Sequence, residues 1–281
     1  MTSADLNGLL HKIMLFSINY STQAAVLLDQ HRIELDRFKC PDWPELIQEA
    51  SRRRPVAVHF TLAAGRGKLR NKNLDKVAAL AEQTGTPFIN LHLEAKLADF
   101  PDIAIGSTHA SDRDKVLAQT LAEVELAVKR FGAGRVIVEN VPYRVSGNVL
   151  RPSVEPELIC QIVRETGCGL LLDIPHARIS AAQLGMDERE YISSLPVQSL
   201  KELHFTGVHT MDGWLQDHLP AQEADWKTLD WVLERIKLGE WPRPWMLAFE
   251  YSGVGEKFSW RSDARAIETH CRRLNSTVSQ F

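Results

Sequence analysis

Residues 155–176 read EPELICQIVRETGCGLLLDIPH, and this stretch contains one helix followed by one strand. Apolar residues recur at helical spacing up to Gly167, where the absence of a side chain suits the end of a helix. The apolar run that follows is short and ends on Asp173, as expected of a strand buried on both faces. Strands of this kind occur in parallel sheets that helices cover.

The same alternation of strand and helix continues along the chain. Apolar runs predict strands at residues 13–19, 33–38, 56–62, 87–93, 135–141, 169–175, 202–208 and 245–251. Segments with helical periodicity separate these runs, and several of them end at a glycine: Gly85, Gly132, Gly167 and Gly239. Eight strand–helix units favour a closed parallel barrel. We therefore predict an α/β fold in which residues 1–281 form a single (β/α)₈ TIM-barrel domain.

An open, doubly wound sheet is the alternative architecture. No G-x-G-x-x-G sequence follows the first predicted strand, so a dinucleotide-binding fold has little support. The 281 residues also match a (β/α)₈ barrel, which commonly has about 250 residues.

Composition excludes several classes of protein. The net charge of −3 is not that of a general nucleic-acid binder, and only the loop 65–72, GRGKLRNK, could meet an anionic group. The four cysteines have no C-x-x-C spacing, so neither a disulfide framework nor a zinc ribbon is expected. No run approaches about 18 apolar residues, and the first residues lack a signal-peptide pattern. We expect a cytoplasmic protein without membrane or nucleic-acid partners.

Metal-competent side chains stand at the ends of six consecutive predicted strands. Because a TIM barrel brings the carboxyl ends of its strands to one face, these side chains should converge. In chain order they are His59, His92, Glu139 with Asn140, Asp173 with His176, His204 and Glu250. The loop after the seventh strand adds Asp212, Gln216, Asp217 and His218.

Each of these residues alone has an ordinary explanation, as a buried core histidine or as a carboxylate that caps the next helix. Carboxylates packed this closely could not all stay ionised without a strong positive charge among them, and metal ions supply one. The expected ligands are His59, His92, Glu139, Asp173, His176, His204, His218 and Glu250. We expect Glu139, Asp173 and Glu250 to be catalytic as well. Imidazole and carboxylate without thiolate suit Fe, Mn or Zn.

This series of residues resembles the ligands of the xylose-isomerase-like barrels, most fully developed in endonuclease IV with its three metals. The resemblance implies that Glu139 and Glu250 bridge metals. That family also has an Asp-x-His pair after the seventh strand, whereas here Gln216 stands two residues before His218. Asp217 or Asp212 could take the place of the missing carboxylate, and two or three metals are expected. Asn140, Gln216 and Asp217 are possible additional ligands.

A closer resemblance covers residues 135–251. The segments VIVENVPY, GCGLLLDIPHARISAAQL, KELHFTG and MLAFEYSG are similar to the multinuclear non-haem iron oxidative enzymes, long catalogued as a domain of unknown function. In this chain Val141 separates Glu139-Asn140 from Pro142, a small departure from the family's pattern. The resemblance implies two or three irons that bind a cysteine thiolate of a ribosomally made peptide, with oxygen as oxidant. It also implies a partner protein that presents the peptide.

Other functions remain open at this point. Phosphodiester hydrolysis, as in endonuclease IV, would need a basic groove, and only the loop 65–72 favours it. A sugar isomerase or epimerase with one metal would have more ligands than it needs. A barrel that binds metal without catalysis is the third alternative, which Gln216 favours. Trp214 could line a substrate pocket, although packing against the core and helices is the more common role of such a residue, and His109 and His209 are candidates to support the ligands.

Overall fold

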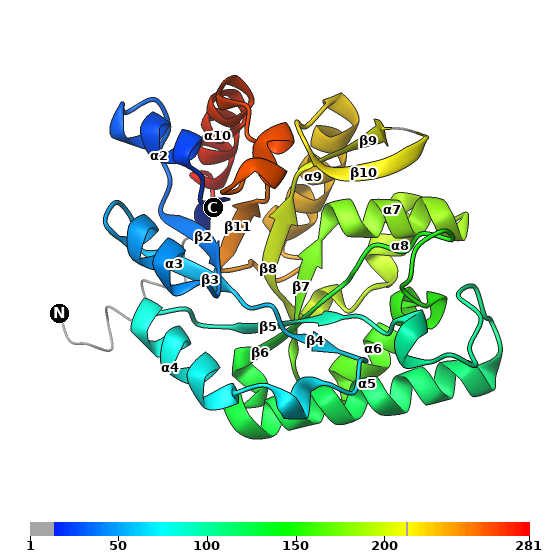
Figure 1. The fold of residues 1–281 in the computed structure, drawn as a ribbon. Coiled ribbons are helices and arrows are strands. Elements are labelled where there is room, and N and C mark those ends of the chain that lie inside the picture. The colour runs from blue at the N-terminus through cyan, green and yellow to red at the C-terminus, as the bar shows by residue number, and fades with distance from the viewer. Residues whose placement is uncertain (1–13, 212) are drawn as a thin grey trace.

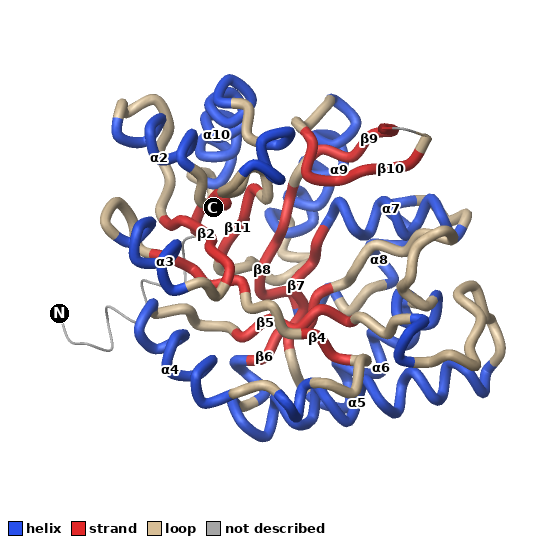
Figure 2. The backbone as a smooth tube through the Cα atoms, viewed as in Figure 1, coloured by secondary structure: helices blue, strands red, loops and turns tan. Residues whose placement is uncertain are grey.

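The computed structural model describes residues 14–211 and 213–281, with strands gathered inside a layer of helices (Figures 1 and 2). The strands of the barrel are β1 (Leu15–Asn19), β2 (Arg37–Pro41), β3 (Val56–His59), β4 (Ala63–Ala64), β5 (Ile89–Leu93), β6 (Val136–Glu139), β7 (Gly169–Asp173), β8 (Leu200–Phe205) and β11 (Met246–Phe249). A separate hairpin consists of β9 (Gly207–Met211) and β10 (Trp214–Leu219).

The α-helices follow the strands in the alternating order that the sequence predicts. They are α2 (Thr22–Asp29), α3 (Pro44–Ser51), α4 (Leu74–Thr84), α5 (Ala110–Phe131), α6 (Pro156–Thr166), α7 (Ile174–Leu184), α8 (Glu188–Ser194), α9 (Glu223–Lys237) and α10 (Ala264–Val278). Gly85 and Gly167 end α4 and α6 in the left-handed conformation, as expected. None of the described helices is long and apolar enough to cross a lipid bilayer.

The sheet confirms the predicted barrel and shows that its third strand is broken in two. All pairings of the large sheet are parallel, in the order β3-β2-β1-β11-β8-β7-β6-β5-β4. The two ends of this order, β3 and β4, are consecutive in the chain. The chain itself therefore closes the barrel as it passes from one to the other, which leaves eight strand positions.

Side chains complete the seam where the third strand is broken. The amide of Asn90 accepts a hydrogen bond from Phe60 N at 2.8 Å and donates one to Phe60 O at 3.2 Å. The hydroxyl of Thr86 accepts from Val58 N at 3.0 Å. Because buried backbone groups need partners, these side chains replace the ladder bonds that a regular strand would form.

The second strand is the main error of the sequence prediction. The sequence predicts it at residues 33–38, but β2 runs from Arg37 to Pro41. Ile33 and Leu35 are buried, yet they lie in the connection that leads into the strand. Their alternation arises from packing of that connection and not from a strand. The first predicted strand begins at Ile13, which lies outside the described residues.

The basic loop 65–72 binds an anionic group, and that group belongs to the protein. The carboxylate of Glu123 on α5 accepts hydrogen bonds from the backbone N–H groups of Gly65, Gly67 and Leu69 at 2.7, 2.9 and 2.6 Å. Gly65 has φ +106°, and a Cβ there would lie 3.0 Å from the backbone of the segment after β5. The loop therefore requires glycine for its close approach.

Two of the four cations of this loop are also neutralised within the molecule. Asp99 forms ion pairs with Arg66 at 2.8 Å and with Lys68 at 2.7 Å. These two cations are therefore not free to bind an external phosphate, which weakens the one feature that favoured nucleic acid.

We expect Glu123→Ala to lower the free energy of unfolding by about 3 kcal/mol, because three backbone N–H groups would lose their acceptor. Urea denaturation measures this loss. Glu125→Ala, at an exposed position of the same helix, is the matched control and should change little. Equal stabilities of the two variants would contradict the role assigned to Glu123.

Candidate metal centre

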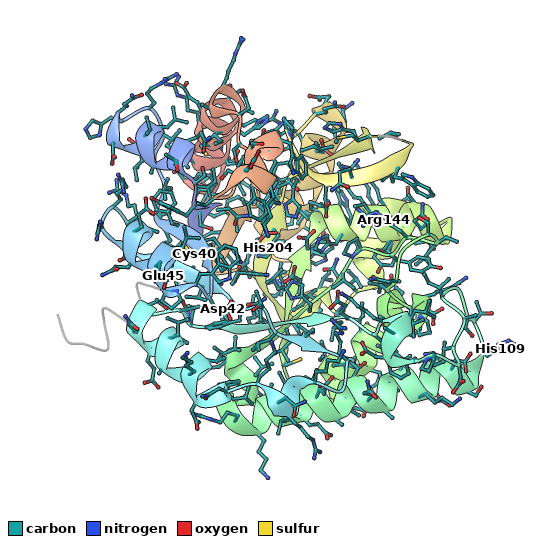
Figure 3. All side chains as sticks on the ribbon, in the orientation of Figure 1. Cys40, Asp42, Glu45, His109, Arg144 and His204 are labelled. Carbon is teal, nitrogen blue, oxygen red and sulfur yellow. The ribbon has the colours of Figure 1, made fainter. Side chains whose placement is uncertain are left out.

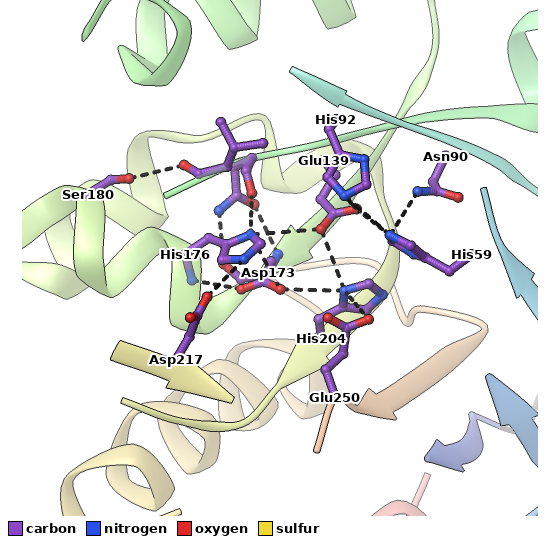
Figure 4. A network of polar contacts seen from close by, with 12 residues as sticks. His59, Asn90, His92, Glu139, Asp173, His176, Ser180, His204, Asp217 and Glu250 are labelled. Atoms are coloured by element: carbon purple, nitrogen blue, oxygen red, sulfur yellow. Dashed lines mark hydrogen bonds and ion pairs between the residues drawn. The ribbon is translucent and has the colours of Figure 1, made fainter. Parts of the chain in front are cut away.

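Side chains from four other predicted strand ends converge on the carboxylate of Glu139, which is 1% exposed at the end of β6. Its Oε2 lies 3.6 Å from His59 Nε2 and 3.4 Å from His92 Nε2. Its Oε1 lies 3.8 Å from the Nδ1 atoms of His176 and His204. Four imidazoles from four different elements thus surround one carboxylate (Figure 4).

Asp173 caps the following helix and also faces the histidines, the two roles that the sequence analysis considered as alternatives. Its Oδ1 accepts a hydrogen bond from His176 N at 2.7 Å and so caps α7. Its Oδ2 lies 3.5 Å from the Nδ1 atoms of both His176 and His204. Pro175 stands in the first turn of α7, so the chain changes from strand to helix at Asp173 and brings both side chains to the barrel mouth.

Asn140 holds this strand exit in place and does not face the carboxylates as a ligand. Its amide donates to Asp173 O and accepts from Asp173 N, both at 2.9 Å. These two bonds tie the end of β6 to the end of β7. They fix the backbone from which Asp173 projects.

Three overlapping groups of side chains have ligand atoms within 4.8 Å of one another. They are His59 with Glu139 and His204, Glu139 with Asp173 and His176, and Asp173 with His204 and Glu250. Glu139, Asp173 and His204 each belong to two of the groups. This sharing is the arrangement that neighbouring metal ions with common ligands require.

The loop after β8 contributes two further side chains through a distortion of the hairpin. The β9–β10 pairing shifts register between Gln216 and Leu219, and His218 has φ +56°. Adjacent residues of a regular strand point to opposite faces, but a bulge with a left-handed residue re-aims them. Asp217 Oδ2 therefore reaches within 3.2 Å of His176 Nε2, while His218 lines the same cleft as Glu139.

This geometry compensates for the departure at Gln216. The amide of Gln216 donates to Asp217 Oδ1 at 2.9 Å, so Gln216 supports the neighbouring carboxylate that faces the site. Asp212, the other candidate for that place, lies outside the described residues.

Backbone carbonyls orient three of the histidines in the same way. The Nδ1 atoms of His92, His176 and His218 lie 3.0, 2.9 and 2.6 Å from Leu62 O, Asn140 O and Glu250 O. A carbonyl can only accept, so each Nδ1 carries a proton and each Nε2 is the nitrogen that a metal ion could bind. A neighbouring carboxylate fixes the ring of His204 in the opposite sense, because its Nε2 lies 3.0 Å from Glu202 Oε1.

The buried carboxylates stabilise positive charge on the neighbouring histidines. Burial opposes the change, but Asp173 and Asp217 raise the pKa of His176 to about 10. Burial likewise opposes the effect of Glu250 and Asp173, which raise the pKa of His204 to about 10. Without metal ions, these imidazoles attract protons in order to balance the carboxylates. Metal ions can replace these protons as the balancing charge.

The buried polar atoms without hydrogen-bond partners fit a metal cluster. Both carboxylate oxygens of Glu139, together with His204 Nδ1 and His59 Nδ1, have none. Orphaned buried polar atoms of this kind are rare in native structures because their desolvation is costly. All four belong to residues of the overlapping groups, and cations coordinated by Glu139 and His204 would satisfy the carboxylate oxygens and the Nδ1 atom.

Two charged residues at the site were not predicted, Lys39 on β2 and Glu202 on β8. The Lys39 ammonium contacts both Glu202 Oε1 and His204 Nε2, and both residues are buried. Trp245 Nε1 donates to Glu202 Oε2 at 2.9 Å. Glu202 stands two residues before His204. Side chains two residues apart in a strand point to the same face, so this spacing could have predicted that Glu202 lies at the site. Lys39 was missed because the predicted second strand ends one residue before it.

The centre opens into a cleft of about 360 Å³. The cleft is lined by the predicted residues His59, His92, Glu139, His176, His218 and Glu250. Trp214 does not line it, because it lies 51% exposed on the β9–β10 hairpin.

The two further histidines do not support the ligands as expected. Figure 3 shows His109 at the periphery of the molecule, far from His204, where it precedes α5. His209 Nε2 faces Pro220 O at 3.1 Å within the hairpin region.

Comparison with known protein families supports the resemblance seen in the sequence. A family model described as RiPP precursor modification enzyme MbnB/TglH/ChrH matches residues 39–247. Similar curated proteins include UPF0276 proteins of Bordetella pertussis, 34% identical over 86 residues, and of Acaryochloris marina, 32% identical over 113 residues. The matches cover 28% and 39% of this chain, and 30% and 40% of those proteins. The chain thus spans about a third of their length in these alignments.

Solved structures with the same architecture include a D-tagatose 3-epimerase-like protein, with a TM-score of 0.60 and 14% identity. The match covers 95% of this chain and 97% of that one. Endonuclease IV from Thermus thermophilus matches with a TM-score of 0.52 and 14% identity over 95% and 100% of the two chains. At these identities the similarity shows the fold alone, which confirms the predicted (β/α)₈ barrel.

We expect Glu202→Gln to lower the free energy of unfolding by about 3 kcal/mol at pH 7, because the buried Lys39 ammonium would lose its counter-charge. Glu240→Gln, which breaks an exposed pair with Arg235, should have little effect. Chemical denaturation of the metal-free proteins measures both.

The difference should also depend on pH in a defined direction. Burial opposes the change, but Lys39 lowers the pKa of Glu202 to about 2 in the folded protein, against 4.5 ordinarily. The stabilising contribution is thus complete above pH 4.5 and is lost as the pH falls toward 2. A difference between wild type and variant that grows on acidification would contradict this assignment.

Proposed function

Because the chain belongs to the MbnB/TglH/ChrH family of RiPP precursor modification enzymes, we propose that it is a metal-dependent oxidative enzyme that acts on a cysteine-containing peptide or small thiol. The proposal includes a di- or trinuclear centre at the barrel mouth. Iron is the preferred metal because the proposed reaction is an oxidation. Zinc and manganese are alternatives because imidazole and carboxylate ligands suit all three metals.

The observation that carries this proposal is the orphaned carboxylate of Glu139 within its ring of imidazoles. We assign Glu139 and Glu250 as bridging or terminal carboxylates and Asp173 as a shared ligand. The nitrogen ligands are His59, His92, His176, His204 and His218, with Asp217 as an added carboxylate. Asn140 and Gln216 are assigned supporting roles because their amides bind Asp173 and Asp217.

When bound, two or three irons would supply sites for a thiolate and for dioxygen and would carry the electrons of the oxidation. The chain determines where the substrate approaches. The side chains of His59 and His92 are 19% and 25% exposed, whereas that of His204 is fully buried. The substrate therefore enters on the His59–His92 side, while the Lys39–Glu202 pair beside His204 is buried.

The alternative functions have less support. The cations Arg66 and Lys68 of the loop 65–72 are paired with Asp99, so half of the basic feature that favoured phosphodiester hydrolysis is already used internally. A one-metal isomerase does not account for three overlapping groups of ligand atoms.

We expect anaerobically purified wild-type protein to hold more than one equivalent of iron, and Asp173→Asn to lose at least one equivalent. Asparagine keeps the oxygen that caps α7 but is a poorer ligand than a carboxylate, so the helix should survive the change. Asp187→Asn, at the cap of α8, is the matched control and should retain all its metal. Elemental analysis with Mössbauer spectroscopy measures both quantities, and full retention in Asp173→Asn would refute the assignment.

Activity separates the proposed function from its alternatives. Iron-loaded protein mixed with oxygen and a cysteine-containing peptide, with a candidate presenting partner where one is found, should produce an oxidised peptide by mass spectrometry. Zinc-loaded protein should not, because zinc has no redox chemistry. Full activity with zinc, or cleavage of DNA at an abasic site, would favour hydrolysis instead.

A further inference from the structure

One cation of the cleft has no role in the metal centre. Arg261 ends the 3-10 helix η6 (Glu256–Arg261), which follows β11 and lies beside α10, in orange in Figure 1. Its side chain lines the same cleft as His59, His218 and Glu250. It therefore stands next to the proposed metals without belonging to their ligands.

The chain holds this guanidinium in a defined place. It lies 4.6 Å from the ring centroid of Phe258 and 5.9 Å from that of Trp260. Phe258 in turn packs against Gly253, where an added Cβ would lie 2.8 Å from the ring. The hydroxyl of Ser262 donates to Phe258 O at 2.9 Å and closes the turn. Stacking and this tight turn limit the conformational freedom that Arg261 would lose on binding.

Arg261 nevertheless lacks an acceptor. Its Nε is buried and has no hydrogen-bond partner, and no carboxylate of the described residues forms an ion pair with its guanidinium. Burial lowers the pKa of Arg261 from its usual value, and Glu250 and Asp217 offset this effect only from a distance. A buried donor such as this Nε is costly to leave without an acceptor, which makes the site ready to receive one.

The charge of the loaded centre favours an external anion over the protein's own carboxylates. Four carboxylates face the centre, those of Glu139, Asp173, Asp217 and Glu250. Two divalent ions would balance all four, and Arg144, which lies 3.8 Å from Asp217 Oδ1, or a third ion would leave the centre positive. Lys39 is already paired with Glu202. The charge of Arg261 then remains uncompensated at the wall of the cleft.

We infer that Arg261 binds a carboxylate of the substrate, so that the thiol-bearing molecule is anchored at the cleft wall while its sulfur faces the metals. The planar fork of arginine matches a carboxylate through two parallel hydrogen bonds. This inference rests on the proposed function. The carboxylate is either the C-terminus of a peptide that ends in cysteine or an acidic side chain next to the cysteine.

The test compares matched ligands that differ only in the carboxylate. N-acetylcysteine and its amide probe the C-terminal source, and the dipeptides N-acetyl-Cys-Asp-amide and N-acetyl-Cys-Asn-amide probe the side-chain source. Calorimetry measures their binding to anaerobic, metal-loaded protein. Wild type should prefer the acid of at least one pair by about tenfold, as expected for a charge-assisted, two-bond contact.

Three variants then test whether Arg261 causes this preference for the carboxylate. Arg261→Gln should abolish it and leave binding of the amide unchanged, and Arg261→Lys, which keeps the charge but loses the fork, should retain part of it. Arg265→Gln, exposed in the first turn of α10, is the control and should bind like wild type. Circular dichroism verifies that each variant is folded. If Arg261→Gln does not fold, the partial loss of preference in Arg261→Lys serves as the test.

A preference in either pair that Arg261→Gln removes supports the inference and identifies the source of the carboxylate. Equal binding of acid and amide in both pairs by wild type, or a preference that Arg261→Gln retains, overturns it. Failure of the proposed function is a separate result, because iron content and peptide oxidation are measured without Arg261 variants. If the protein binds no iron but still prefers the carboxylate, the Arg261 site is supported and the proposed oxidative function is not.

Discussion

A group of carboxylates buried at the barrel mouth is the constraint on which the rest of this structure depends. Glu139 has two oxygens without partners, and Asp173, Asp217 and Glu250 approach the same imidazoles. Burying such charges is unfavourable unless cations balance them. Protons on His176 and His204 can do so in part, and metal ions can do so fully. The surrounding fold is arranged to hold these groups together despite their repulsion.

Backbone atoms carry out most of that arrangement. Three carbonyls orient three imidazoles, and the Asn140 amide ties two strand ends together. The irregular elements of the fold serve the same end. At the break in the third strand, Leu62 O faces both the backbone N–H and the Nδ1 of His92, and the bulge at His218 brings Asp217 to His176 and His218 into the cleft. Local departures from regular structure thus occur where the site needs them, as is common at functional sites.

Sequence reasoning succeeded where a residue's environment follows from its own strand. His204 and Glu250 end buried apolar runs, and barrel closure then brings them together. It failed where long-range partners decide. Lys39 can face inward only because Glu202, 163 positions away in the chain, balances its charge. No local sequence pattern predicts a buried lysine. The apolar alternation at residues 33–38, which predicted the strand too early, comes from a packed connection. Arg261 was missed for the same reason, because its lack of an acceptor is a property of its surroundings.

The sequence by itself determined the order of strands and helices, the barrel, and the set of side chains at the strand ends, because periodicity and chain order govern all three. Only the tertiary structure decided how these side chains are used. Asp173 caps α7 and also faces two imidazoles, Asn140 ties two strand ends together, and Asp217 lies against His176 where the sequence has no carboxylate at position 216. The tertiary structure also turned the basic loop inward onto Glu123. These outcomes depend on distances between residues far apart in the chain, which a linear pattern does not contain.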